Sequence, residues 1–229
     1  MTEIKKNLEK LYDRLARAAQ RAGRDPGGIK VVAVSKNQTA ATIREGVQAG
    51  IKILGENRVQ EFLEKYEAVE EQAEWHFIGH LQTNKVKYIV DKVQLIHSLD
   101  NLPLTEEIDK RAGQKGLTVK ALVQVNISGE NSKFGLAPKE VASFLETVSD
   151  RFGNIEIQGL MTIAPLSQEA EVARTCFRGL RKLADSIRER NLSRVHMDYL
   201  SMGMTNDFEI AVEEGSNIVR IGRAIFGDR

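Results

Sequence analysis

The sequence predicts an α/β protein built as a closed (β/α)₈ TIM barrel with one extra N-terminal helix. Eight short, apolar, β-branched runs are spread over the 229 residues. Helical patterns separate consecutive runs, which indicates parallel strands joined by right-handed crossovers. Eight such units in a chain of this size are typical of a barrel. A doubly wound open sheet is the competing fold, but no glycine-rich dinucleotide motif follows the first run, which weakens that alternative.

The first element is an amphipathic helix over residues 3–22. Its apolar residues, from Ile4 to Ala18, recur three or four positions apart. The segment "GRDPGG" then ends the helix, because glycine and proline interrupt a helical pattern.

The apolar runs follow, and each is expected to form one strand. They cover residues 29–36, 51–57, 74–80, 93–100, 118–127, 155–163, 195–202 and 217–227. Clear helical patterns lie between them, for example at 40–50, 58–72 and 171–190. Glycines such as Gly50, Gly116 and Gly215 precede several runs, as expected where helices end. No linker or low-complexity segment divides the chain, so we expect one domain over residues 1–229.

Composition excludes several classes of protein. The net charge of +1 provides no broad electrostatic surface for nucleic acid or an anionic membrane. No run reaches the roughly 20 apolar residues that a membrane span needs, and the N-terminus does not resemble a signal peptide. The single cysteine, Cys176, excludes an intrachain disulfide and every multi-cysteine metal site. We therefore expect a cytoplasmic protein with no metal site and neither nucleic-acid nor membrane partners.

Polar residues follow the predicted strands at their carboxyl ends, which in a barrel form the face that holds the site. These residues are Lys36, Glu56, Asn57, His80, Ser98, Asp100, Asn126, Ser128, Ser201, Arg220 and Gly222. For Thr39, Ser98 and Asp100 the ordinary interpretation is an N-cap of the next helix. For His80, packing or capping competes evenly with ligand contact.

Lys36 is a candidate Schiff-base lysine. It follows the apolar run "VVAVS", so its ammonium group is expected to enter the barrel mouth rather than bulk water. Removal from water lowers the pKa of a lysine and makes the neutral amine available to condense with an aldehyde. A surface lysine at a strand end is the alternative.

The last two runs predict a phosphate site, because barrels commonly hold phosphate in the loops after strands seven and eight. Ser201 can donate a hydroxyl, and Gly203 and Gly222 allow close approach of the backbone. The alternative is that these glycines serve only tight turns. Arg220 lies within an apolar run, and a buried arginine needs an acceptor, which a ligand can provide.

Taken together, the motifs resemble the pyridoxal 5′-phosphate (PLP) homeostasis protein family, also called YggS/PROSC. They are "VVAVSKNQ", "GENRVQE", "WHFIGHLQTNK", "IHSLD", "VNISGENSKFGL", "GLMTIAP" and "LSMGMTNDFEIAVEEGSNIVRIGRAIFG". The resemblance spans nearly the whole chain. It implies a barrel similar to the N-terminal domain of alanine racemase, the type III fold of PLP-binding proteins.

The resemblance also implies roles for individual residues. Lys36 would carry PLP as an internal aldimine, and Asn57 would lie near the ring. Arg220 would face the pyridine nitrogen. Ser201 would hold the phosphate together with the backbone N–H groups of Gly222 and Arg223, and the loop containing Gly203 would complete the phosphate cradle.

The implied function is binding without established catalysis: buffering PLP and passing it on, with effects on vitamin B6 and amino-acid balance. Apo-enzymes that need PLP are the implied acceptors. The chain stops shortly after the eighth run, so the racemase's second domain and its catalytic tyrosine are expected to be absent, which favours a monomer.

Two enzymes remain as alternatives. The first is a single-domain, PLP-dependent amino-acid racemase. The second is a phosphosugar aldolase with Lys36 as its Schiff-base lysine, although such aldolases usually carry this lysine on a later strand. Racemisation of added alanine or serine separates the first alternative from a carrier, and the absorbance of a bound aldimine separates the second.

Overall fold

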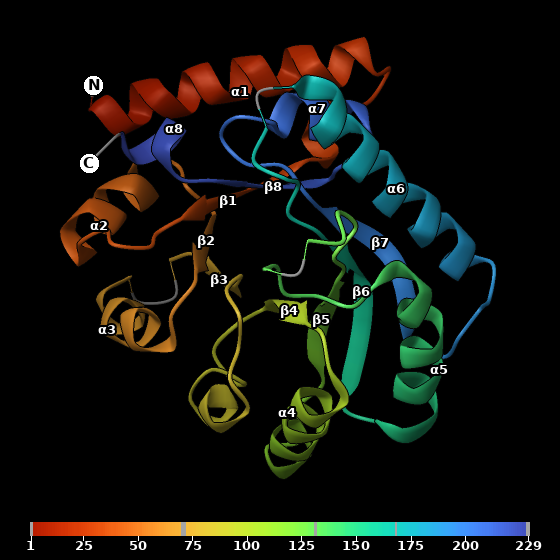
Figure 1. Ribbon diagram of the computed structural model, residues 1–229. Coiled ribbons are helices and arrows are strands. Elements are labelled where there is room, and N and C mark those ends of the chain that lie inside the picture. Colours follow the sequence, from red (N-terminus) through yellow and green to blue (C-terminus); the bar gives the residue numbers. More distant parts are fainter. Residues whose placement is uncertain (1, 70–71, 131, 168, 228–229) are drawn as a thin grey trace.

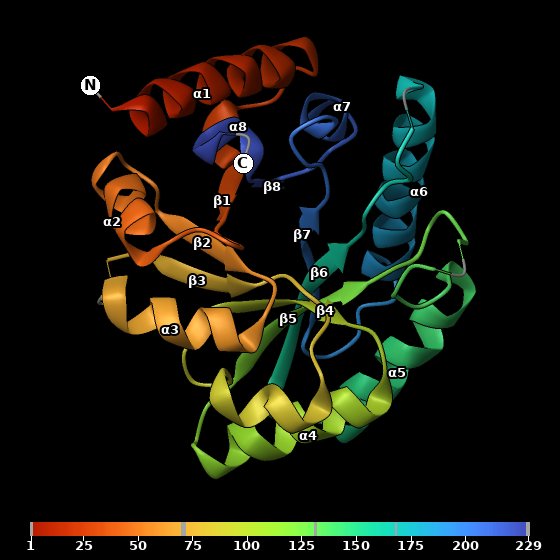
Figure 2. The same ribbon diagram turned by 60° about the vertical axis from the view of Figure 1, so that its left-hand side comes forward.

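A computed structural model of the chain describes residues 2–69, 72–130, 132–167 and 169–227. Eight parallel strands close into one barrel in chain order, β1 to β8, and β8 pairs with β1. Helices surround the barrel on its outside (Figures 1 and 2). The predicted barrel with an extra N-terminal helix is therefore confirmed.

Each predicted run contains one strand. The strands are β1 Lys30–Val34, β2 Ile53–Glu56, β3 Glu74–Phe77, β4 Leu95–Leu99, β5 Val119–Gln124, β6 Ile155–Met161, β7 Val195–Ser201 and β8 Ile218–Ile221. The α-helices are α1 Glu3–Arg21, α2 Ala40–Gln48, α3 Val59–Val69, α4 Leu102–Gln114, α5 Val141–Arg151, α6 Ala170–Arg188, α7 Phe208–Glu213 and α8 Arg223–Phe226. Part of the predicted helical segment 58–72, namely Glu70 and Glu71, lies outside the described residues.

The prediction was wrong about the end of the last run. The strand stops at Ile221, and the chain turns at Gly222 into the short helix α8 instead of remaining extended to residue 227. The carbonyl of Gly222 accepts the N–H groups of Ile225 and Phe226, which closes this helical turn. The helix is significant for the site because its first residues lie at the carboxyl end of β8, at the barrel mouth.

The inside of the barrel is a small apolar cluster to which seven strands contribute, together with Ile78 directly after β3. Its buried members are Val32, Ile53, Ile78, Leu95, Leu122, Met161 and Ile218, with Val34 and Tyr199 packed against them. A second and larger apolar core lies between the strands and the helices. Because side chains alternate along a strand, a residue's parity determines whether it faces the inside of the barrel or the helices.

Helix α1 crosses the outside of the barrel and packs against α7 and α8 (Figure 1). Its apolar face, which includes Leu8, Leu11 and Leu15, is buried. Ion pairs from Arg14 to Glu209 and from Arg21 to Glu213 border the same contact. Among the residues that the structure describes, no helix is long and apolar enough to cross a lipid bilayer.

Candidate functional site

Lys36 lies on a tight turn directly after β1. The N–H of Gln38 donates to the carbonyl of Ser35 at 3.0 Å, and Asn37 has a φ of 57°. Val32 and Val34 belong to the inner apolar cluster, so Lys36 lies at the mouth end of the inward-facing series. The prediction of a desolvated lysine was wrong, because Lys36 is exposed at the rim.

Asn57 follows β2 at the same edge of the mouth. Its backbone N–H donates to Oε1 of Glu56 at 2.8 Å. Its Oδ1 is buried and has no hydrogen-bond partner among the residues that the structure describes. The segment after β3 approaches it closely, because a Cβ on Gly79 would lie 2.2 Å from the Asn57 carbonyl oxygen. Asn57 is thus fixed by its backbone, while its buried side-chain oxygen has no partner among the described residues.

Arg220 is held inside the barrel at the end of β8. Its Nη1 donates to the carbonyl oxygen and the hydroxyl of Ser201, at 2.8 and 2.6 Å, and its Nη2 donates to the carbonyl of Thr162 at 2.9 Å. The side chain is only 4% exposed. Burial lowers the pKa of Arg220 to about 10, an effect that Asp207 opposes. The guanidinium is therefore charged at neutral pH, and its three protein contacts leave N–H donors among its five.

A chain of hydrogen bonds continues from Ser201 across the barrel. The Ser201 hydroxyl lies 2.9 Å from Nδ1 of His97, and Nε2 of His97 lies 2.9 Å from Nδ1 of His76. Burial, more than the neighbouring charge of Lys30, lowers the pKa of His76 to about 3. Burial also places the pKa of His97 well below its usual range, with smaller contributions from His76 and Arg220.

Both histidines are consequently neutral, and each ring offers one donor and one acceptor. Arg220 can only donate, so the Ser201 hydroxyl accepts from it. Of the two contacts of neutral His97, one is donated by the ring and the other is accepted by it. A hydrogen-bond network that spans β3, β4, β7 and β8 orients the guanidinium. This network restricts the rotamers that the long Arg220 side chain can adopt.

The phosphate role expected for Ser201 stays a prediction. Ser201 is fully buried, and its hydroxyl contacts Arg220 and His97. The phosphate role expected for Gly203 also stays a prediction. Its φ is 94° and an added Cβ would lie 2.5 Å from Cβ of Ala211, so its turn against α7 by itself requires a glycine.

Gly222 has no such internal explanation. Its φ is −109°, which any residue adopts, and the protein atom nearest to an added Cβ would be Cβ of Val34 at 3.5 Å, an ordinary contact. Helix α8 begins at the next residue, Arg223, whose side chain is exposed. At the mouth, no side chain of its own covers the backbone at Gly222, although a Cβ would fit there. The backbone of Arg223 follows directly.

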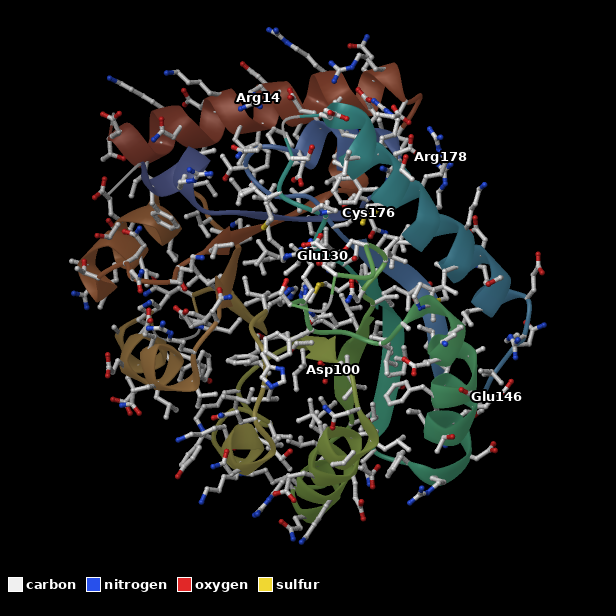
Figure 3. The ribbon with its side chains drawn as sticks, in the orientation of Figure 1. Arg14, Asp100, Glu130, Glu146, Cys176 and Arg178 are labelled. Carbon is white, nitrogen blue, oxygen red and sulfur yellow. The ribbon has the colours of Figure 1, made fainter. Side chains whose placement is uncertain are left out.

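The described residues 126–130 and 132–137, which follow β5, form a loop at the opposite side of the mouth. Phe134, 56% exposed, stacks on His80 with ring centroids 4.1 Å apart. Beneath it lies a cavity of about 150 Å³, bounded by Gln124, Val125, Asn126, Ser132, Lys133, Phe134 and Ile163. Figure 3 places Glu130 from this loop and Asp100 after β4 within the ring of helices, whereas Arg178 and Glu146 lie on outer helices.

Other polar residues singled out in the sequence have structural roles. Asn126 accepts the Ser128 hydroxyl and the N–H of Gly129, and it therefore shapes the loop. Thr39 is the N-cap of α2, as expected. The N-cap of α4 is Asn101, so the capping role considered for Ser98 and Asp100 was wrong.

Sequence reasoning missed His76, His97 and Thr162. A usable signal was present, because both histidines stand within apolar runs at inward-facing positions of neighbouring strands. Only the closed barrel brings them to Ser201.

Comparison with known proteins places these features in context. The family model "Alanine racemase, N-terminal domain" matches residues 7–229. The chain is 46% identical over 224 residues to the pyridoxal phosphate homeostasis protein of Aquifex aeolicus, covering 97% of this chain and 96% of that protein. It is 40% identical to the protein of the same name from Pseudomonas aeruginosa, covering 100% and 97% of the two chains.

A solved structure of PipY from Synechococcus elongatus, with PLP bound, superposes with a TM-score of 0.82 at 34% identity and covers 93% of this chain and all of PipY. Alanine racemase from Clostridium difficile superposes with a TM-score of 0.72 at 14% identity, covering 99% of this chain and 56% of the racemase, which is a likeness of fold.

Proposed function

This chain belongs to the pyridoxal phosphate homeostasis protein family, and from this premise we propose that it binds PLP at the mouth of its barrel. It buffers the cofactor, hands it to apo-enzymes that require it, and so takes part in vitamin B6 and amino-acid homeostasis in the cytoplasm. The observation that carries the proposal is the buried guanidinium of Arg220, whose three protein contacts leave N–H donors for an acceptor on a ligand.

The donor set fits a phosphorylated pyridine aldehyde. Lys36 provides a primary amine at the rim, and this amine holds the aldehyde carbon as an imine, the internal aldimine. The buried guanidinium of Arg220 has donors left for the pyridine nitrogen. The bare backbone at Gly222 and Arg223 provides N–H groups for the phosphate. Ser201 supports the site through Arg220 rather than by contact with phosphate.

Arg220 favours binding over catalysis. An arginine does not give up its proton in a protein, so it donates a hydrogen bond to the pyridine nitrogen without protonating it. PLP supplies chemistry as an electron sink, most strongly when its pyridine nitrogen is protonated, and a cation fixed at that nitrogen disfavours its protonation. A carrier needs only reversible imine formation, for which an unprotonated ring and a monomer are sufficient.

The proposal is tested with purified protein reconstituted with PLP. An absorbance band at the edge of the visible range should form, and borohydride reduction followed by peptide mapping should place the adduct on the peptide containing Lys36. Lys36→Ala should abolish the band but keep part of the affinity through the phosphate contacts. An adduct confined to Lys133 or Lys52 would contradict the assignment of Lys36, and racemisation of alanine at enzymatic rates would contradict the carrier function.

A further inference from the structure

A buried charged cluster lies directly behind the turn that carries Lys36. Nζ of Lys65, on α3, lies 2.7 Å from Oε2 of Glu56 at the end of β2 and 2.9 Å from Oε2 of Glu61. The Lys65 side chain is 7% exposed, Glu56 is 0% and Glu61 is 19%. Burying charges carries a desolvation cost that pairing offsets only with good geometry and further hydrogen bonds. A buried lysine between two carboxylates is thus a costly arrangement on a helix that could have presented an apolar side chain.

The cluster contacts both sequence neighbours of Lys36. Lys65 donates to the carbonyl of Ser35 at 2.8 Å, and the Ser35 hydroxyl donates to Oε2 of Glu56 at 2.8 Å. On the other side, the N–H of Asn37 donates to Oε2 of Glu61 at 2.8 Å.

Asn37 has a positive φ, which residues with a side chain adopt infrequently. The contact with Glu61 holds it in that conformation. The pKa of the Glu61 carboxyl shows the strength of these contacts. Burial raises the pKa of Glu61, yet the hydrogen bonds from Asn37 and Lys65 outweigh burial and lower it overall. The same Glu56 carboxylate also accepts the backbone N–H of Asn57. One ionic cluster therefore fixes the turn before and after Lys36 and the neighbouring Asn57.

We propose that Lys65 is a positioning residue for Lys36. Acting with Glu56 and Glu61, its ammonium group fixes the Ser35–Asn37 backbone so that the amine of Lys36 meets the aldehyde carbon of PLP in a productive orientation. This inference rests on the proposed function.

In the step concerned, Nζ of Lys36 forms a C=N bond to the aldehyde carbon, and the C=O bond of the aldehyde breaks. The oxygen leaves as water together with the two hydrogens that the neutral amine loses. Lys65 contacts no reacting atom. A misplacement of about 1 Å can slow a reaction about a hundredfold, so loosening this turn should slow imine formation.

The test separates imine formation from non-covalent binding. Lys65→Met removes the charge at similar volume, and Lys52→Met makes the same change at an exposed position elsewhere. Imine formation with PLP is followed by stopped-flow absorbance and by mass after borohydride reduction. Non-covalent binding is measured calorimetrically with pyridoxine 5′-phosphate, whose alcohol cannot form an imine.

For Lys65→Met we expect imine formation to slow about ten- to a hundredfold, while the affinity for pyridoxine 5′-phosphate stays within about twofold of wild type. Lys52→Met should match wild type in both measurements. Imine formation at the wild-type rate in Lys65→Met, or an equal loss of imine formation and pyridoxine 5′-phosphate affinity, would overturn the inference. Absence of any imine in the wild-type protein would instead overturn the proposed function.

A second pair of variants decides the question if Lys65→Met does not fold. Glu61→Gln keeps an oxygen that can accept the Asn37 N–H, whereas Glu61→Leu removes it; Lys65 keeps Glu56 as its partner in both. We expect Glu61→Leu to slow imine formation and Glu61→Gln to restore most of the rate. Equal rates in these two variants would contradict the positioning role.

Discussion

The hydroxyl of Ser201 lies 2.6 Å from Nη1 of Arg220. A serine on β7 thus fixes the orientation of a charged side chain on β8, and His97 bonds the same hydroxyl from β4. The contact suits an indirect role for Ser201 in the proposed site. There we expect Ser201 to act through Arg220, and the backbone at Gly222 and Arg223 to hold the phosphate.

Ser201→Ala should therefore weaken PLP and pyridoxal by the same factor. The variant removes one hydrogen bond of a charged group, worth about 1.5–3 kcal/mol. Affinity falls only by the share of this energy that changes the contact between Arg220 and the pyridine ring. The measurement is the affinity of each compound for wild type and variant, by fluorescence or absorbance titration. A loss seen with PLP but not with pyridoxal would show that the hydroxyl binds phosphate after all.

Gly222→Ala should weaken PLP while leaving the fold intact. The backbone at this position tolerates a side chain and the added Cβ would meet only an ordinary contact with Val34, whereas a bound phosphate would meet a methyl group. A loss of about 1.5 kcal/mol corresponds to a little over tenfold in affinity. Pyridoxal, which lacks the phosphate, should be affected much less.

Gly203→Ala is the matched comparison and should show the opposite pattern. Its positive φ and the approach to Ala211 should destabilise the fold by about 1–3 kcal/mol. Chemical denaturation without ligand measures this for both variants. A stable Gly203→Ala protein with weakened PLP binding would restore Gly203 to the phosphate site.

These two glycines show where sequence reasoning reaches its limit. Both stand in loops after the last strands, and the sequence treats them alike. Only the backbone angle and the neighbouring atoms separate Gly203, required by its turn, from Gly222, which no internal contact explains. The barrel itself was predictable, because the alternation of apolar runs with helical patterns is a local signal and eight such runs occur along the chain.

The positions of Lys36, Asn57 and Arg220 near the mouth were predictable for a related reason, since each follows or interrupts an apolar run. Lys65 was not, because on the amphipathic helix α3 its sequence position resembles a surface lysine. Its partner Glu56 comes from a different element, and their contact arises only when α3 packs beside β2. The His76–His97 chain likewise depends on the closure of the barrel, which brings β4 opposite β7.

The buried histidines predict a loss of stability in mild acid. In the unfolded chain a histidine takes up a proton near pH 6.5, whereas folded His76 does so only at about 3. Between these values the unfolded state binds more protons, so the free energy of unfolding falls as the pH falls, by about 1.4 kcal/mol per pH unit for each such histidine. Above pH 6.5 the contribution is fully present.

Urea denaturation between pH 4 and 6 measures this slope. His76→Gln should reduce it by about 1.4 kcal/mol per pH unit, and His196→Gln, at an exposed position, is the matched control for the same chemical change. Carboxylates also titrate in this range, so the difference between the two variants is the informative quantity. Identical slopes would show that His76 is not kept neutral by the fold.

The last prediction concerns Arg220 and the α-carbon of an added amino acid. With Arg220 in place, the wild-type protein loaded with PLP should exchange the α-proton of alanine much more slowly than about 1 s⁻¹, the lower end of typical enzymatic rates.

A carboxylate at this position would be a poor test, because it would face the carbonyl oxygens of Ser201 and Thr162 that the guanidinium now contacts. Arg220→Gln is more suitable, since its amide can still donate to one of these carbonyls while the fixed positive charge is removed. Without that charge the pyridine nitrogen can take up a proton, and the exchange rate per bound cofactor should rise even as affinity falls. NMR in heavy water follows the exchange directly, with bound PLP quantified by absorbance. Exchange by the wild-type protein at 1 s⁻¹ or faster, or a variant that exchanges more slowly than wild type, would contradict the idea that Arg220 holds the site in a binding role.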